Sequence, residues 1–307
     1  MSQLNGRSYT AGKFLFELDG HRCGYLQSFD GGDLQGEIAE HKSGTSNFNK
    51  KHMTTFKYTP IKMRTGIGMS KGMYQWIQAA FDLGVLYKNG AVTVTNFDYK
   101  AQRRMDIINM LMTKVTLPTL DGSSKESGYF DLEFVPEQCR WLKESGADVR
   151  GEIGAKQKGW HCANWKLELS GLETACKRVA KIEGISWECK TTMDSIGDAR
   201  ENTIHPVATT VSDWTIHMSM ADIEPFAQKA KQWFVDGKCL EGDEMTAAIT
   251  LLGPDMSTEF GRIEFLNVGI KEFKANPKME GQNESVARGS MKLYAEQVKF
   301  HLLQTDA

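Results

Sequence analysis

Residues 61–81 read IKMRTGIGMSKGMYQWIQAAF, and a closely similar pattern returns at residues 214–234 as WTIHMSMADIEPFAQKAKQWF. Each stretch opens with apolar residues at alternate positions, which is typical of a half-buried β-strand. Each then changes to apolar residues spaced i, i+4, i+7 and i+8, which lie on one face of an α-helix. The offset is 214 − 61 = 153 residues without a gap. The sequence therefore predicts the same strand-and-helix unit twice.

The two predicted helices each have one apolar face, which we expect to pack against a sheet. These faces consist of Met73, Ile77, Ala80 and Phe81 in the first helix, and of Phe226, Ala230, Trp233 and Phe234 in the second.

Three further blocks match in the same order. Phe14–Gly20 matches Trp165–Gly171 at an offset of 165 − 14 = 151, and Arg104–Asn109 matches Arg262–Asn267 at 262 − 104 = 158. The last, FDLEF from Phe130, is matched to MKLYA from Met291 at 291 − 130 = 161. The offset grows along the chain, so we expect the differences to lie in loops. We predict a first domain over residues 10–140, a polar, glycine-rich linker over 141–159 and a second domain over 160–307. The alternative is two unrelated α+β regions.

Each predicted copy has strands, then one helix, then more strands. This order lacks the regular β-α alternation of a parallel sheet. The sequence therefore predicts a mainly β (α+β) protein with two tandem antiparallel β-sandwich or barrel domains, each with one flanking α-helix.

The composition narrows the function classes. The formal net charge of the 307 residues is −2, so no bulk basic character attracts nucleic acid. No apolar run approaches the ~20 residues needed to span a bilayer, and the first residues lack the layout of a signal peptide. The six cysteines are irregularly spaced without a C-x-x-C pair, and no zinc-site spacing is present. We expect no metal, no cofactor and no membrane partner.

Two long segments, Glu40–Thr55 and its counterpart Thr191–Thr210, read as loops. Loops of this length are uncommon in compact domains and are often functional, although mobile surface loops are the alternative. Lys50–His52 would contact nucleic acid if it lined a lumen, or would be a solvated loop tip. The candidate contact residues are Lys42, Phe48, Lys50, Lys51, His52, Met193, Arg200, Asn202 and His205.

Residues 68–72, GMSKG, match the G-x-S-x-G nucleophile elbow of serine hydrolases. An acid (Asp194 or Asp213) and a histidine (His217 or His301) follow in the required order. The elbow, however, caps a parallel sheet that the pattern does not predict, and Ser70 aligns with Ile223 in the second copy. We interpret Ser70 as a helix N-cap and keep a serine hydrolase as the alternative; the leading prediction is not an enzyme.

The first copy resembles a known family. KYTPIKMRTGI from Lys57, followed by SKGMYQWI from Ser70, resembles the tail tube family of T-even-type phages and related contractile injection systems. Phe14–Gly20, Gly24–Gly32 and the strand Phe130–Pro136 fit the same pattern, over roughly residues 12–137. The second copy departs from it, with Lys229 where the first has Trp76, and His217 and Ser219 where the first has Arg64 and Gly66.

The resemblance implies a structural subunit. In this family six small β-barrel or sandwich domains form a ring, and rings stack into a hollow conduit for DNA or protein cargo inside a contractile sheath. The long loop would reach a neighbouring ring. Two domains per chain imply a homotrimer ring with pseudo-sixfold symmetry; the alternative is six chains whose second domain is a decoration or adaptor.

The resemblance also implies partners and a location. The partners would be sheath, baseplate, tail-terminator and tape-measure proteins. The location would be a virion tail or injection-system particle assembled in the bacterial cytoplasm. A repeated tube subunit and a tube initiator or baseplate adaptor both fit the sequence, as do a phage and an injection system.

Overall fold

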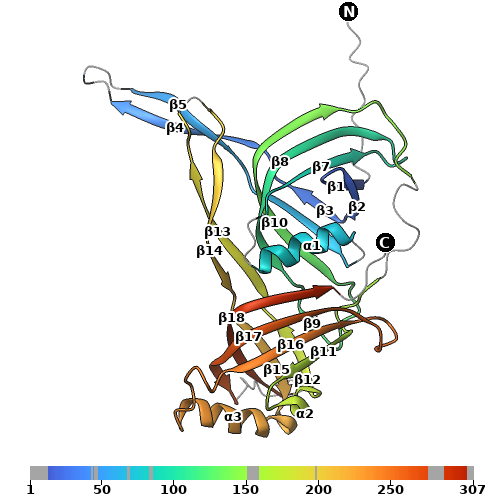
Figure 1. Ribbon diagram of the computed structural model, residues 1–307, viewed down its shortest axis with the longest axis vertical. Coiled ribbons are helices and arrows are strands. Elements are labelled where there is room, and N and C mark those ends of the chain that lie inside the picture. Colours follow the sequence, from blue (N-terminus) through green and yellow to red (C-terminus); the bar gives the residue numbers. More distant parts are fainter. Residues whose placement is uncertain are drawn as a thin grey trace, which may run out of the picture.

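The structure is a computed structural model that describes residues 13–42, 44, 48–67, 70–82, 86–150, 159–197, 199–275 and 287–302. Two curled sheets lie one above the other along the long axis, and two hairpins project on one side (Figure 1). The first half contains β1 (Lys13–Leu18), β2 (His21–Leu26), β3 (Ser28–Asp30), β4 (Leu34–Lys42), β5 (Asn49–Tyr58), β6 (Ile61–Gly66), α1 (Lys71–Phe81), β7 (Lys88–Thr95), β8 (Ala101–Thr116), β9 (Leu120–Asp121) and β10 (Tyr129–Lys143).

The second half follows a similar order of elements, with α2 in place of β2, an added 3₁₀ turn and, in the described part, no counterpart of β9. It contains β11 (Trp165–Leu169), α2 (Glu173–Cys176), β12 (Val179–Glu183), β13 (Ser186–Asp194), β14 (Thr203–Val211), β15 (Trp214–Ser219), the 3₁₀ turn η1 (Met220–Asp222), α3 (Glu224–Phe234), β16 (Met245–Leu252), β17 (Glu259–Lys274) and β18 (Arg288–Leu302).

The order of strands is the same in the two sheets. The first sheet runs β2-β1-β7-β8-β10-β6-β3 and the second runs β11-β16-β17-β18-β15-β12-β9. From β1 and β11 onward, six strands correspond one to one. All named pairings in the described part of the chain are antiparallel, which confirms the predicted mainly β class. The domain boundaries stay a prediction.

Strand register aligns the halves residue by residue. Phe16 lies opposite Val92 as Leu167 lies opposite Ile249, at the predicted offset of 167 − 16 = 151. Asn109 and Asn267, at an offset of 158, both have left-handed φ angles of 50° and 53°. In the last strand, however, Leu132 lies opposite Val115 as Met291 lies opposite Phe273. The offset there is 291 − 132 = 159, so the predicted 161 is wrong by two residues. A shift of two preserves the side-chain alternation of a strand, which is why pattern matching missed it.

The helices bury one face each against their sheets. Met73, Ile77, Ala80 and Phe81 of α1 are buried, as are Phe226, Ala230 and Trp233 of α3. The prediction for Phe234 is wrong, because its side chain is 52% exposed. Phe234 ends α3, and Val235 after it is exposed too, so the packed face stops at Trp233.

One hydrophobic cluster crosses both halves. Phe300 of β18 lies among three rings of the first half, with centroids 5.8 Å from Tyr74, 6.3 Å from Phe81 and 6.2 Å from Phe130. Trp160 stacks on Phe130 at 6.1 Å. Strand β9, from the first half, pairs with β12 at the edge of the second sheet. The halves are therefore packed together and are not two separate bodies on a tether.

Two segments differ from the sequence-based prediction. Strand β10 continues to Lys143, into the predicted linker, because it pairs with β8 as far as Arg103; residues 151–158 of that linker lie outside the described part. The predicted loops Glu40–Thr55 and Thr191–Thr210 are largely the two hairpins β4–β5 and β13–β14. Both faces of β4–β5 are mostly exposed, so its residues lack the apolar alternation that identifies a strand. No helix of the described residues is long and apolar enough to cross a membrane.

The shared core leads to a stability prediction. Phe300→Ala removes a ring that is 2% exposed and touches both halves. We expect a loss of about 3–5 kcal/mol in the free energy of unfolding, as for buried Phe→Ala changes generally. Urea unfolding followed by circular dichroism measures it. The matched control is Phe234→Ala at an exposed position, for which we expect a change within about 0.5 kcal/mol. Equal effects of the two changes would contradict the shared core.

Candidate functional site: an assembly interface

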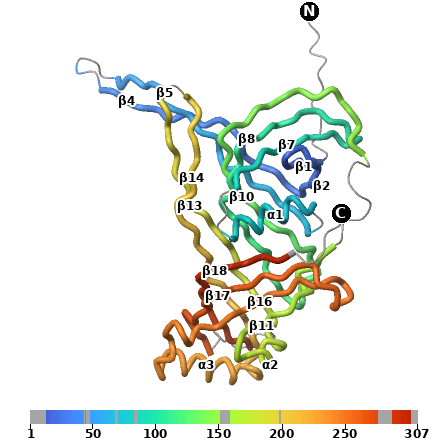
Figure 2. The backbone as a smooth tube through the Cα atoms, viewed as in Figure 1, coloured from blue at the N-terminus to red at the C-terminus, as the bar shows by residue number. Residues whose placement is uncertain are grey.

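Hairpin β13–β14, here called the docked hairpin (residues 186–211), reaches from the second half along the first (Figure 2). Its base extends the first sheet: Ser186, Trp187 and Glu188 pair with Thr116, Val115 and Lys114 of β8. The Leu117 amide donates to the Ile185 carbonyl oxygen at 3.0 Å. Lys114 Nζ lies 2.6 Å from Glu188 Oε1, and this hydrogen bond is the main cause of the raised pKa of Lys114.

Trp187 anchors the base of the docked hairpin. Its side chain is 4% exposed and meets the Phe81 ring edge-on at a centroid distance of 5.5 Å. The contact joins β13 to the C-terminal end of α1. The hairpin is thus held to the first half by backbone pairing on one side and by aromatic packing on the other.

Higher up the docked hairpin, Ile204 fills a small socket in the first half. The socket consists of Leu111, Val135 and Tyr87, and the Ile204 side chain is 2% exposed. The Tyr87 hydroxyl donates to the Ile204 carbonyl oxygen at 2.5 Å.

Glu137 completes this contact from β10. Its Oε1 accepts the Ile204 amide at 3.0 Å, and its Oε2 accepts Asn109 Nδ2 at 2.7 Å. Glu137 thus satisfies a backbone group of the docked hairpin while Asn109 holds the carboxylate in place.

The tip of the docked hairpin touches the base of the other hairpin. Glu201 accepts the Tyr58 hydroxyl at 3.0 Å and forms an ion pair with Arg140. The pKa of Tyr58 is raised, chiefly by burial and then by its hydrogen bond to Glu201. Asn202 Nδ2 donates to the Phe56 carbonyl oxygen at 3.5 Å.

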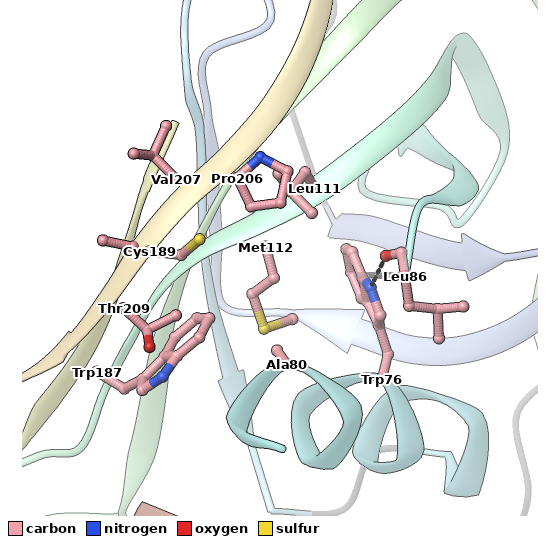
Figure 3. Close-up of a pocket in the computed structure, with 11 residues that line it drawn as sticks. Trp76, Ala80, Leu86, Leu111, Met112, Trp187, Cys189, Pro206, Val207 and Thr209 are labelled. Atoms are coloured by element: carbon pink, nitrogen blue, oxygen red, sulfur yellow. Dashed lines mark hydrogen bonds between the residues drawn. The ribbon is translucent and has the colours of Figure 1, made fainter. Parts of the chain in front are cut away.

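A cavity of about 320 Å³ remains between α1, β8 and the docked hairpin. Figure 3 shows Trp76 and Ala80 of α1, Met112 of β8, and Trp187, Pro206 and Val207 of the docked hairpin around it. Its lining is largely apolar, and Trp76 Nε1 is already satisfied by the Leu86 carbonyl oxygen at 3.0 Å. The lining residues provide few hydrogen-bonding groups for a ligand. We therefore interpret the cavity as incomplete packing within the interface.

Hairpin β4–β5, here called the free hairpin (residues 34–58), is the counterpart of the docked hairpin. It pairs only with itself among the described strands and projects away from the molecule (Figure 1). Four large apolar side chains on it are exposed: Leu34 by 68%, Ile38 by 63%, Phe48 by 82% and Met53 by 59%. Exposed apolar side chains gathered on one projecting element indicate an interaction site.

The sheet edge of the second half is also uncovered. Strand β16 pairs with β17 only from Glu259 to Val268. Lys271, Glu272 and Lys274 beyond that point are exposed. The corresponding end of β8 is covered by the docked hairpin. Among the described residues, one hairpin is therefore undocked, and the β17 segment equivalent to the docking edge of β8 is unpaired on that side.

The predicted contact residues divide between the two hairpins. Lys42, Phe48, Lys50, Lys51 and His52 lie on the free hairpin, and Met193, Arg200, Asn202 and His205 on the docked one. In the docked hairpin, Asn202 reaches the first half, and Met193 lines a small pocket beside Phe56 and Pro136. Arg200 and His205 are exposed, and His205 lies 3.3 Å from Thr203 Oγ1 of its own strand.

Sequence reasoning missed the residues that hold the docked hairpin, namely Trp187, Ile204, Glu137 and Glu201. The apolar pair Trp187 and Cys189 at alternate positions was the available signal for a strand before the predicted loop. Glu137 and Glu201 carry no signal of this kind, because surface carboxylates are common.

Ser70 is not arranged as a hydrolase nucleophile. It occupies the N-cap position of α1 but makes no side-chain cap; its hydroxyl donates to the Cys23 thiol at 3.1 Å. The pairings of the described strands are antiparallel, whereas a nucleophile elbow caps a parallel sheet. His217 lies in the other half and contacts Glu183 at 3.0 Å. Within the described ranges no three His, Cys, Asp or Glu side chains gather as metal ligands.

Comparison with solved structures gives matches that each cover slightly under half of the chain. The sheath–tube complex of the PVC extracellular contractile injection system matches at 17% identity over 46% of this chain and 95% of the other, with a TM-score of 0.41. The tube-terminating cap of the anti-feeding prophage matches at 19% over 47% and 97%, with a TM-score of 0.41. The anti-feeding prophage baseplate matches at 14% over 46% and 98%, with a TM-score of 0.40. Comparison with curated proteins gives no match.

The family comparison is more specific. The model of the T4-like virus tail tube protein gp19 family matches residues 10–140, which contain β1 to β9, α1 and all but the last three residues of β10. This span includes the free hairpin and the β8 edge on which the docked hairpin lies. Residues 10–140 of this chain, slightly under half of its length, are therefore similar to the T4-like virus tail tube protein family.

Proposed function

We propose that the chain is a tandem tail tube subunit, in which both halves are tube domains that assemble into stacked rings around a conduit for DNA or protein cargo. The observation that carries the proposal is the repeated strand order of the second sheet, together with the docking of its hairpin on the first. One chain thus holds two similar units already joined by a sheet-edge contact, as neighbours in a ring would be.

The number of chains in the proposed ring follows from two units per chain and six units per ring. In the described part of the chain, one hairpin-to-edge contact is made internally, and one hairpin and the equivalent edge segment of β17 are left without such a contact. A heterologous contact of this kind closes into a ring when the rotation per unit allows it. Six units per ring, the number that family resemblance implies, require three chains. We therefore propose a homotrimer ring with pseudo-sixfold symmetry.

The proposed partners are those that a tube meets: a sheath around it, a baseplate and a tail terminator at its ends, and a tape-measure protein, DNA or a protein cargo in its lumen. The proposed location is the tail of a virion or of an injection-system particle, assembled in the bacterial cytoplasm. An initiator or baseplate adaptor would use the same ring but would not extend it.

The chain count gives a direct prediction. We expect the purified protein at high concentration to form rings whose mass is three times the 34.4 kDa of one chain, and to stack into tubes. Mass photometry and negative-stain microscopy measure both. A ring mass of six chains would refute the trimer, single rings that never stack would favour the adaptor, and a protein that stays monomeric would overturn the proposed function.

A second prediction concerns catalysis. Ser70 donates its hydrogen bond to the thiol of Cys23, whose pKa is raised by burial, so this partner is not a general base that could activate Ser70. We expect a fluorophosphonate probe to leave Ser70 unlabelled, as judged by intact mass spectrometry, with a known serine hydrolase as the positive control. Stoichiometric labelling that Ser70→Ala abolishes would revive the hydrolase alternative.

A further inference from the structure

The two hairpins are equivalent residue by residue. In the docked hairpin, Trp187 lies opposite Val211, and the register shifts after Lys190. In the free hairpin, Leu34 lies opposite Tyr58, and the register shifts after Glu37. The offset is 153 at each of these positions (187 − 34, 211 − 58 and 190 − 37). Both hairpins therefore have the same bend at the same place, and either could occupy a similar groove.

The sheet edges are equivalent too. Lys114, Val115 and Thr116 of β8 correspond to Glu272, Phe273 and Lys274 of β17, because both triplets pair with equivalent residues of β10 and β18. Suppose that the free hairpin of another copy lies on this β17 edge as the docked hairpin lies on β8. The pairs are then Asp33 opposite Lys274, Leu34 opposite Phe273 and Gln35 opposite Glu272. The three pairs are an ion pair, an apolar pair and a hydrogen-bonding pair. Leu34, 68% exposed in the single chain, would be covered as Trp187 is.

The socket is where the two contacts differ in chemistry. By the same registers, Lys51 takes the place of Ile204. The socket residues Leu111, Val135 and Tyr87 become Gly269, Tyr294 and Glu244, and Glu137 becomes Glu296. An apolar residue in an apolar socket is thus replaced by a cation facing two carboxylates.

The acidic socket is already formed in the single chain. Glu296 Oε2 accepts Asn267 Nδ2 at 2.6 Å, just as Glu137 accepts Asn109, and in the described part of the chain its other oxygen has no partner. The pKa of Glu244 is raised by burial and then by the carboxylates of Glu296 and Glu241. A like-charge cluster of this kind is relieved by an incoming cation.

The hairpin tips show a compensating exchange. In the docked hairpin, Glu201 binds the Tyr58 hydroxyl. In the transferred contact, Phe48 takes the place of Glu201 and Val211 takes the place of Tyr58, each at the offset of 153 residues. A polar pair is therefore replaced by an apolar pair. Phe48 is 82% exposed. The base of the free hairpin, Lys51 and Phe48 therefore each lie opposite a chemically matched position on the second half in this arrangement.

We propose that the free hairpin of one chain docks on the second half of another copy of the chain, pairing Asp33–Gln35 with Glu272–Lys274 and placing Lys51 between Glu244 and Glu296. This inference rests on the proposed ring and names the contact that closes it. In the single chain Lys51 pairs with Glu40 at 2.7 Å, but both side chains are about half exposed, so that pair contributes little and exchanges readily.

The proposed contact also explains how chains join in one order. Lys51 placed in the Ile204 socket would bury an ammonium among apolar side chains, which is costly. Ile204 placed in the acidic socket would bring no cation to the carboxylates of Glu244 and Glu296. Each hairpin therefore fits only its own socket, and a mismatch is penalised by charge. Contacts within a chain and between chains would alternate around the ring.

Charge reversal tests the contact. We expect Lys51→Glu to raise the concentration for half-maximal ring assembly at least about tenfold, which corresponds to ~1.4 kcal/mol per contact, and Lys51→Glu with Glu244→Lys to recover most of the loss. The matched control is Lys50→Glu, the neighbouring residue whose side chain points to the opposite face of β5. The circular dichroism spectrum of each variant as a monomer should match that of the wild type, which would show that the substitution leaves the fold unchanged.

A crosslink tests the register. In a Cys239→Ser background, because Cys239 is the exposed native thiol among the described cysteines, chains with Leu34→Cys are mixed with chains carrying Phe273→Cys and treated with a short bismaleimide. We expect a covalent dimer only in the mixture. His41→Cys, about 23 Å further along β4, is the control and should not crosslink. The proposed contact is wrong if the wild type forms rings but Lys51→Glu assembles normally, or if the crosslink fails within rings. The tube function would stand in both cases. If the wild type forms no rings, the function itself is rejected.

Discussion

Strand β8 is longer than its neighbour β7, and the rest of the structure depends on how the unpaired end of β8 is satisfied. Strand β8 has 16 residues, but β7 pairs with it only from Ala101 to Met110. The remaining backbone groups on that edge need partners, because an unpaired edge either finds another strand or stays exposed to chance pairing. In this chain β13 supplies the partner. The position of the second half follows from that pairing.

The shared aromatic cluster is the second consequence. Once β13 lies on β8, the end of β18 is brought against α1, and Phe300 enters a ring of aromatic residues from the first half. Gly128 allows Trp160 to lie close to β10 beside this cluster, since a Cβ at Gly128 would lie 1.9 Å from the Trp160 ring. The two units are therefore packed directly against each other, and in the proposed ring this packing would set the rotation from one unit to the next.

A duplicated chain can let its two interfaces diverge, whereas a chain with a single copy must use one interface everywhere. The apolar Ile204 socket and the acidic socket at Glu244 and Glu296 are equivalent in position but opposite in chemistry. The contact made inside a chain forms during folding, so its socket can be lined by the apolar side chains of Leu111 and Val135. A contact made between chains has to remain soluble until assembly, and charged residues suit that need.

Much of the fold could be predicted from the sequence, because local patterns carry it. The repeated strand and helix units, the helix faces from Met73 to Trp233 and the antiparallel class all follow from residue spacing. The exposure of Phe234 did not follow, because spacing places it on the apolar face while the end of α3 lies beyond the packed surface. The two hairpins were read as loops, since a strand exposed on both faces has no alternating pattern to detect.

The sequence by itself predicted that the chain carries one unit twice and that its first copy resembles tail tube proteins. Only the tertiary structure decided which hairpin is docked and which is free, and it alone aligned Lys51 with Ile204. The physical reason is that helix faces and strands depend on residues close together in the chain. Sheet-edge pairing between Lys114 and Glu188, by contrast, depends on backbone groups more than 70 residues apart, and nothing local records which edge a hairpin meets.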